Sequence, residues 1–207
     1  MDDILITKGD PLSNVGSKLN CMALEYMAYP LAGSKEPTLI EKVFKKLWEI
    51  DSNRFSYEYA FEAKLNDKTV GMITCFPVTV MNKLNWLTTK KLFKLRNLGL
   101  IRYILLHPKE TLSMLSLNEG KEDEYHIGSI ATLPESRGYG IGSKLIYFAE
   151  EQAKLNHYNK CSLTVKKENK KAIKLYEKLG FKIVDSIEKP PYSLHRMVKI
   201  IDIDTIF

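Results

Sequence analysis

The chain has 207 residues, of which 44% are hydrophobic and 27% charged, and its formal net charge at pH 7 is +6. This hydrophobic content supports a packed core and excludes wholesale disorder, while the positive charge favours anionic partners without choosing among nucleotides, nucleic acid and acidic membranes. Three scattered cysteines, in no CxxC spacing, argue against a zinc cluster and a disulfide framework.

The first ten residues, MDDILITKGD, are acidic at their start and lack a sustained apolar stretch, so the sequence predicts no secretory signal. No apolar run approaches the roughly 18 residues of a membrane-spanning helix, since Arg102 interrupts the most hydrophobic segment, residues 98–106. We therefore expect a cytoplasmic protein without stable membrane insertion.

The first half of the chain gives an uneven pattern, and residues 11–30 are ambiguous. Residues 38–50 place apolar side chains at helical spacing, with Thr38 as the expected N-cap and Glu41 completing a capping box. Strand-like runs at 55–65 and 68–78, separated by a polar turn, predict a hairpin. Residues 79–123 look helical and basic, with a break at Pro108. The acidic segment 118–124 is expected to be a solvated loop or, if it lies near a binding cleft, to attract a cationic group.

The second half alternates strands and helices. A strand at 125–133 leads through a glycine-rich turn into a helix from Ile141 to about Asn156, and a strand at 161–165 follows. Asn169 suits the N-cap of the next helix, and Gly180 suits the left-handed position past its end. Strands are expected at 181–187 and 192–203. We interpret the chain as one α+β or α/β domain.

The glycine-rich turn places Gly138, Gly140 and Gly142 where a helix is about to begin, although each glycine weakens a helix by about 1 kcal/mol. Glycines let the main chain curl so that several N–H groups converge beside the partial positive charge of a helix N-terminus. The result is a phosphate cradle. The spacing matches neither the P-loop nor the dinucleotide fingerprint, and a tight turn without a ligand is the alternative.

Two motifs resemble the GNAT superfamily of N-acetyltransferases. The first is Arg137-x-x-Gly140-x-Gly142, with Pro134 ahead of it, which is similar to the superfamily's acetyl-CoA signature. The second runs from Asn169 to Phe181 and matches the pattern N-x-x-A-x-x-x-Y-x-x-x-G-F. The resemblance covers residues 124–199 well and residues 55–78 loosely.

The resemblance implies a fold and a co-substrate. The expected fold is a single domain over residues 1–207, with a mixed, mostly antiparallel sheet of six to seven strands. That sheet is splayed at its middle and flanked by helices, with a helical insertion at about 79–123 between the third and fourth strands. The co-substrate is acetyl-CoA, and no metal is expected. The implied cofactor contacts are the main chain of Ile130, Ala131 and Thr132 for pantetheine, the segment Arg137, Gly138, Tyr139, Gly140, Ile141, Gly142 and Ser143 for the diphosphate, and Asn169 and Ala172.

The resemblance also implies direct acyl transfer to a primary amine in a ternary complex. Tyr176 is the implied proton donor to the leaving thiolate, and the alternative is a purely apolar packing role. His126 is the implied general base, because imidazole titrates near neutral pH. Glu62 and a water chain are the rival bases.

The sequence does not identify the acceptor beyond a small-molecule or peptide amine. The transferred acyl chain could also be longer than an acetyl group. The insertion could form a lid or a dimer contact, an amphipathic membrane or partner helix, or ordinary packed helices. A non-catalytic acyl-CoA sensor or scaffold is the alternative function. Nucleic-acid binding is not expected, because no helix clusters arginine reading heads.

Overall fold

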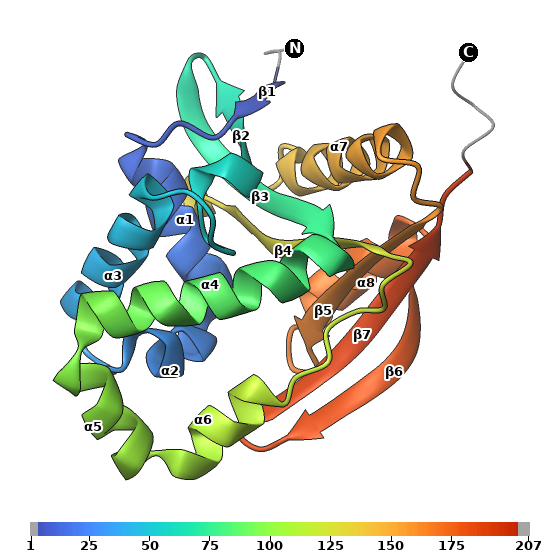
Figure 1. Cartoon of the computed structure of the whole chain (residues 1–207). Coiled ribbons are helices and arrows are strands. Elements are labelled where there is room, and N and C mark those ends of the chain that lie inside the picture. Colours follow the sequence, from blue (N-terminus) through green and yellow to red (C-terminus); the bar gives the residue numbers. More distant parts are fainter. Residues whose placement is uncertain (1–3, 203–207) are drawn as a thin grey trace.

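The computed structural model describes residues 4–202, which form one seven-stranded sheet with the order β1-β2-β3-β4-β5-β7-β6 (Figure 1). Every neighbouring pair is antiparallel except β4 and β5, which are parallel. The strands are β1 (Ile4–Lys8), β2 (Ala60–Leu65), β3 (Lys68–Pro77), β4 (Tyr125–Thr132), β5 (Lys160–Lys166), β6 (Lys182–Lys189) and β7 (Tyr192–Ile200). The expected mixed, mostly antiparallel sheet is confirmed.

Helices cover both faces of the sheet. One face packs against α7 (Ile141–Leu155) and α8 (Lys170–Lys178), and the other against α1 (Asn14–Leu24) and α3 (Pro37–Glu49). The predicted insertion between β3 and β4 is present as α4 (Val78–Arg96), α5 (Leu98–Leu106) and α6 (Pro108–Leu115). The remaining short helices are η1 (Glu25–Met27), α2 (Ala28–Ala32), η2 (Tyr57–Tyr59) and η3 (Pro134–Ser136).

Several local expectations need correction. The helix expected to start at Thr38 starts at Pro37 with Glu36 as its N-cap, because proline suits the first helical position. The first β2 residue is Ala60, since a 3-10 turn occupies residues 57–59. The ambiguous residues 11–30 form α1, η1 and most of α2, and β1 was not predicted. Residue 203 of the last predicted strand lies outside the described residues.

A one-residue irregularity in β4 decides where the sheet opens. Thr74 pairs with Ser129 and Cys75 pairs with Ile127, so Gly128 is an extra residue of β4. Such a bulge bends the strand and increases its twist. A Cβ at Gly128 would lie 2.8 Å from Cζ of the buried Phe76, which explains the glycine. Pairing of β4 with β5 accordingly ends at Ile127, and the two strands diverge.

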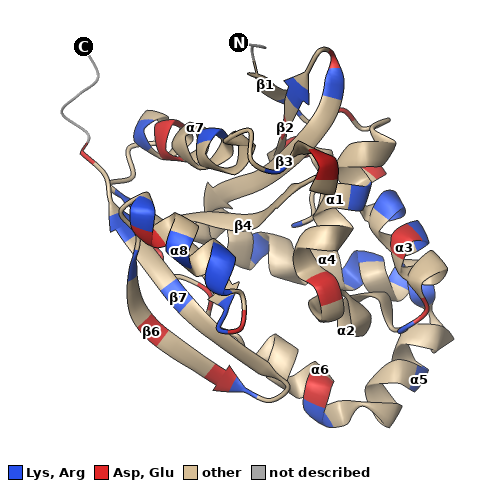
Figure 2. Ribbon diagram, turned by 180° about the vertical axis from the view of Figure 1, so that it is seen from behind, with Lys and Arg blue, Asp and Glu red and all other residues tan. Residues whose placement is uncertain are grey.

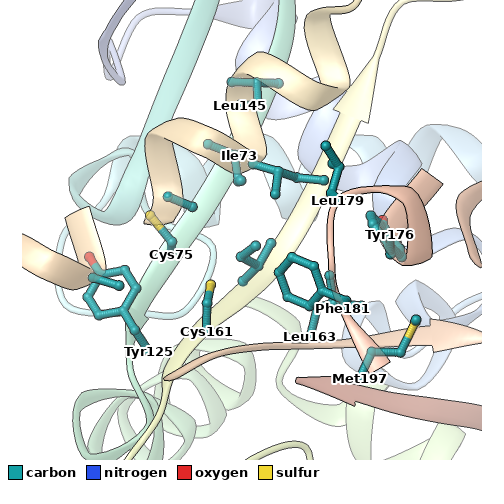
Figure 3. Close-up of a cluster of buried hydrophobic side chains, with 14 of the residues drawn as sticks. Ile73, Cys75, Tyr125, Leu145, Cys161, Leu163, Tyr176, Leu179, Phe181 and Met197 are labelled. Carbon is teal, nitrogen blue, oxygen red and sulfur yellow. The ribbon is translucent and has the colours of Figure 1, made fainter. Parts of the chain in front are cut away.

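The core between the sheet and helices α7 and α8 holds the diverging strands in place. Figure 3 shows its members gathered from β3, β4, β5, β7, α7 and α8, among them Ile73, Leu145, Leu163 and Phe181. Cys75 and Cys161 are buried in the same cluster as free thiols, as small hydrophobic residues often are. Since α7 follows β4 and α8 follows β5, this packing fixes both helix starts near the opening.

The acidic segment 118–124 is not simply a solvated loop. Glu124 is buried, and its carboxylate accepts hydrogen bonds from the Arg196 guanidinium and, at 3.0 Å, from the Lys121 amide. Its main-chain oxygen accepts a 3.0 Å hydrogen bond from the Val78 amide. The buried ion pair therefore ties the segment to β7 and to the start of α4.

We predict that Arg196→Met lowers the free energy of unfolding by about 3–5 kcal/mol, because it leaves the buried Glu124 carboxylate without its cation. The double variant Arg196→Met/Glu124→Leu should recover most of the loss. Urea denaturation followed by circular dichroism measures both. Lys160→Met, which removes an exposed ion pair with Asp123, is the control and should change little. A double variant as unstable as the single one would contradict the prediction.

Candidate functional site

A cavity of about 240 Å³ lies where β4 and β5 diverge. The strands contribute two of its walls, through residues 127–130 of β4 and residues 163–166 of β5. The opposite walls come from α1, η1 and α2, from α4, and from residues 114–119 at the end of α6 and just after it. The cavity therefore joins the opening in the sheet to the helical insertion.

Ile130, Ala131 and Thr132 lie on β4 beyond the last pair with β5. All three pair with β3 on the opposite edge, and the edge towards β5 has no strand partner among the described residues. Ile130 lines the cavity, whereas the Thr132 methyl lies against Gly71 and α7. An open strand edge of this kind leaves main-chain donors and acceptors for a ligand.

The turn before α7 has the shape that its glycines predict. Gly138 and Gly140 have φ of +91° and +74°, which L-residues rarely adopt, and Gly142 lies in the first helical turn. Among the described residues, none accepts a hydrogen bond from the amides of residues 138–143, and the first bond of the helix is from Lys144 to Gly140. Arg137 and Tyr139 are exposed, and Ile141 is buried. Ser143 is half-buried. The six consecutive amides of this turn and helix start therefore have no hydrogen-bond acceptor among the described residues.

The second motif lies across the opening from this turn. Asn169 caps α8, as predicted, by accepting a 3.1 Å hydrogen bond from the Ala172 amide. Asn169 and Tyr176 line the cavity, whereas Ala172 packs against the core. Gly180 follows the helix with φ of +93°. Burial raises the pKa of Tyr176 to about 12, so its phenol is protonated at neutral pH and can donate a hydrogen bond.

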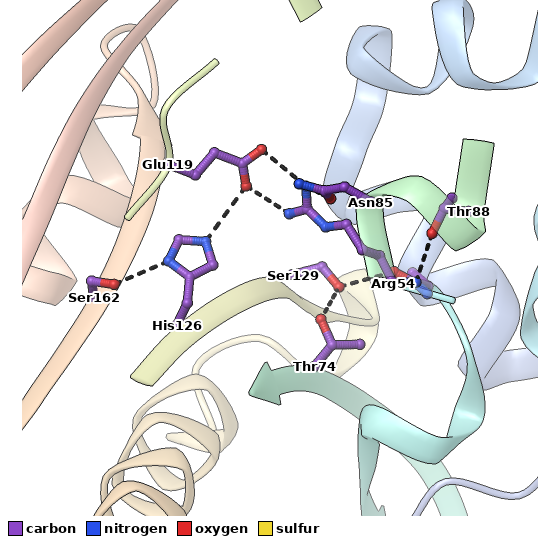
Figure 4. A network of polar contacts seen from close by, with 9 residues as sticks. Arg54, Thr74, Asn85, Thr88, Glu119, His126, Ser129 and Ser162 are labelled. Carbon is purple, nitrogen blue, oxygen red and sulfur yellow. Dashed lines mark hydrogen bonds and ion pairs between the residues drawn. The ribbon is translucent and has the colours of Figure 1, made fainter. Parts of the chain in front are cut away.

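The polar part of the far wall is an ion pair that the sequence did not reveal. Arg54 donates to both carboxylate oxygens of Glu119, at 3.2 and 2.6 Å, and at 3.1 Å to the Asn85 side chain (Figure 4). All three residues line the cavity. Burial favours a raised pKa for Glu119, but Arg54 and the neighbouring His126 outweigh it and hold the pKa well below its usual range. Glu119 therefore stays ionised.

His126 lies directly behind Glu119. It is fully buried, and its Nδ1 is 3.0 Å from the Ser162 hydroxyl of β5. Its Nε2 lies 3.5 Å from a Glu119 oxygen and has no hydrogen-bond partner among the described residues. The cavity lining includes Glu119 and not His126, so the imidazole reaches the cavity through Glu119.

Glu62 lies away from this constellation. Its buried carboxylate accepts hydrogen bonds from the Ser13 hydroxyl and, at 3.4 Å, from the Asp10 amide. Ser13 is the N-cap of α1, so Glu62 supports the start of that helix. It is not among the residues that line the cavity.

Within residues 4–202, no group of three or more His, Cys, Asp or Glu side chains is arranged to hold a metal ion. Over the same residues, no helix combines the length and the hydrophobicity that crossing a membrane requires.

Comparison with known proteins identifies relatives of the domain. Residues 22–181 match the family model described as "Acetyltransferase (GNAT) family". No curated protein matches the chain. Among solved structures, an N-acetyltransferase from Staphylococcus aureus Mu50 has 24% identity and a TM-score of 0.71, over 94% of this chain and 99% of its own. An acetyltransferase with 20% identity has a TM-score of 0.70, over 96% and 100%. PaiA N-acetyltransferase from Thermoplasma acidophilum, in complex with coenzyme A, has 16% identity and a TM-score of 0.54, over 96% and 99%.

Proposed function

Because this chain belongs to the GNAT acetyltransferase family, whose members are acyltransferases, we propose that it transfers an acetyl group from acetyl-CoA to a primary amine. The amine attacks the thioester directly while both substrates are bound. The observation that carries this proposal is the continuity of the cavity, which runs from the open edge of β4, Asn169 and Tyr176 to the Arg54–Glu119 pair. One cavity can therefore hold the thioester and the amine side by side.

Coenzyme A fits the opening in the sheet. The free amides of residues 138–143 and the Arg137 side chain suit its diphosphate, since a helix N-terminus binds anions. The unpaired edge of β4 at Ile130, Ala131 and Thr132 suits the pantetheine amides, and Asn169 closes the other side. The main-chain N–H near Ile130 would polarise the acyl carbonyl. Coenzyme A bound to the PaiA relative supports this assignment.

Acetyl transfer requires one new bond, one broken bond and the loss of a proton. The amine nitrogen forms a bond to the carbonyl carbon, the carbon–sulfur bond breaks, and the proton of the amine leaves. Tyr176 donates its hydrogen bond, and then its proton, to the departing sulfur and is reprotonated from solvent. Its pKa of about 12 exceeds that of a free thiol, so the transfer relies on the raised basicity of a thiolate released in a desolvated cavity.

The acceptor amine enters from the insertion side, where Glu119 offers the permanently ionised carboxylate that an ammonium group requires. Glu119 is a weak base because Arg54 stabilises its charge. His126 is the proposed proton acceptor behind it, since its Nε2 lies 3.5 Å from a Glu119 oxygen. The ammonium first loses one proton along Glu119 to the imidazole, which makes its nitrogen a nucleophile. The second proton leaves that nitrogen to solvent as the amide forms.

We predict that Gly140→Ala weakens coenzyme A binding by about tenfold or more, because the added Cβ strains a left-handed residue of the cradle. Gly180→Ala is the matched control: it imposes the same kind of strain at φ +93°, past the end of α8, and should leave affinity unchanged at a similar cost in stability. Isothermal titration calorimetry with thermal melts of both variants measures the difference. Equal affinities for the two variants would contradict the cradle.

We predict that Tyr176→Phe lowers kcat by about tenfold or more with coenzyme A affinity retained, because the variant keeps the ring and removes only the donor. Release of free thiol from acetyl-CoA over a panel of primary amines measures turnover. An unchanged kcat would remove Tyr176 from the chemistry. Failure of every amine with the unchanged protein, despite measurable acetyl-CoA binding, would overturn acyl transfer itself.

We predict that His126→Asn lowers kcat/KM by about tenfold or more, because the proton acceptor is gone. Ser162→Ala is the control, since it keeps the imidazole and removes only its 3.0 Å partner. Both are measured as kcat/KM over the amine panel, beside thermal melts that check folding. An unchanged kcat/KM in His126→Asn would mean that His126 only links β4 to β5.

A further inference from the structure

The insertion presents large apolar side chains that nothing in the fold covers. On α5, Leu98, Ile101 and Leu105 lie three and four residues apart, so they share one helical face, and Leu106 adjoins them. On α6, Leu112 and Leu115 repeat the pattern. Leu98, Leu105 and Leu115 are 79%, 74% and 70% exposed. We call these six residues the α5–α6 apolar face, and large exposed apolar side chains grouped on neighbouring helices often mark an interaction site.

The opposite side of α5 is already used by the fold. Leu100 is buried against α2 and α3, and Tyr103 is buried with its hydroxyl donating a 3.0 Å hydrogen bond to Glu110. Apart from Arg102 the helix is therefore apolar on both sides, although only one side has a partner within residues 4–202. A helix that is apolar all round is normally enclosed. The apolar face of α5 thus lacks a partner that its composition calls for.

The positive charge of the insertion indicates which kind of partner would cover the α5–α6 apolar face. The insertion, residues 78–115, contains seven Lys and Arg residues and one acidic residue, so its net charge of +6 equals that of the whole chain and the rest of the chain is neutral. The seven cations are Lys83, Lys90, Lys91, Lys94, Arg96, Arg102 and Lys109. Among the described residues, only Lys91 of these forms an ion pair, at 4.0 Å from Asp51. The positive charge of the insertion is therefore free to attract an external anion.

Three cations lie beside the α5–α6 apolar face. Arg102 is exposed within the stripe of α5 and is the only charged residue of that helix, as its single basic band in Figure 2 shows. Lys94 is exposed in the last turn of α4, just before the break at Asn97 that precedes Leu98, and Lys109 lies three residues before Leu112. The single acid, Glu110, is turned towards Tyr103 and His107 and is largely shielded. Apolar and cationic side chains therefore share this surface.

We propose that the α5–α6 apolar face docks on an anionic lipid surface. Leucine and isoleucine side chains enter the interface between headgroups and acyl chains, while lysine and arginine side chains reach the phosphates. In Figure 1, α5 and α6 form the edge of the molecule opposite α7 and β1, so this edge can meet a flat surface. The contact is peripheral, since no helix among the described residues could span a bilayer.

Two other occupants fit the charge and chemistry less well. A second copy of this chain would bring two insertions of net charge +6 together, and like charges oppose that pairing. A nucleic acid would satisfy the cations and leave six large apolar side chains without a partner. An anionic lipid surface satisfies both features at once.

The experiment is flotation of the full chain with vesicles, without acetyl-CoA or amine, so its outcome is independent of acyl transfer. One vesicle set is phosphatidylcholine, and the other mixes phosphatidylcholine with phosphatidylglycerol. We expect binding to the anionic vesicles that weakens as salt is added, and little binding to the neutral ones. The triple variant Leu98→Gln/Ile101→Gln/Leu105→Gln should bind the anionic vesicles about tenfold or more weakly.

Matched controls separate docking from general surface hydrophobicity. Leu5→Gln/Leu12→Gln/Leu155→Gln changes three exposed leucines on β1, a loop and α7, and should bind as the unchanged chain does. Leu115 is left intact because it also lines the cavity. Equal binding to both vesicle types, no binding, or equal losses in the two triple variants would overturn the proposal. So would light scattering that shows a dimer dissociated by the α5 triple variant.

Discussion

The requirement that buried main-chain N–H and C=O groups find partners governs this structure. The parallel strands β4 and β5 satisfy each other over three residue pairs only, and the bulge at Gly128 then turns β4 away. Beyond that point the sheet leaves an edge that a ligand with amide groups can complete. Because α7 follows β4 and α8 follows β5, the same divergence brings two helix starts to the two sides of one opening.

Side-chain contacts also hold β4 and β5 together at the end of the opening where the two strands still pair. His126 and Ser162 face each other in the last stretch of pairing and are joined at 3.0 Å, so a side-chain contact reinforces the strand pairs where they end. Behind them, the buried pair Glu124–Arg196 holds the segment that carries Glu119. The Glu119 carboxylate, which faces the cavity, is thus held next to His126, one of the last residues of β4 that pair with β5.

How much of this could be predicted from the sequence depends on how local each feature is. The glycine-rich turn before α7, the cap at Asn169 and the left-handed Gly180 were predicted because turn and cap chemistry involves residues within a few positions of each other. Arg54 and Glu119 are 65 residues apart and meet only once the insertion has folded back, so no local pattern marks them. The start of α3 was misplaced because Pro37 and Thr38 both suit a helix start, and proline at the first position prevailed.

The helices of the insertion have one side that lines the cavity and another that is exposed. Asn85, Thr88 and Leu92 of α4, with Met114 of α6, line the cavity and shape the space beside Glu119. The outward sides of the same segment carry free cations and the α5–α6 apolar face. In the proposed function the inward residues border the amine, and the outward residues carry the proposed lipid contact. Substitutions on one side should leave the other property intact, except near Leu115, which is exposed and also borders the cavity.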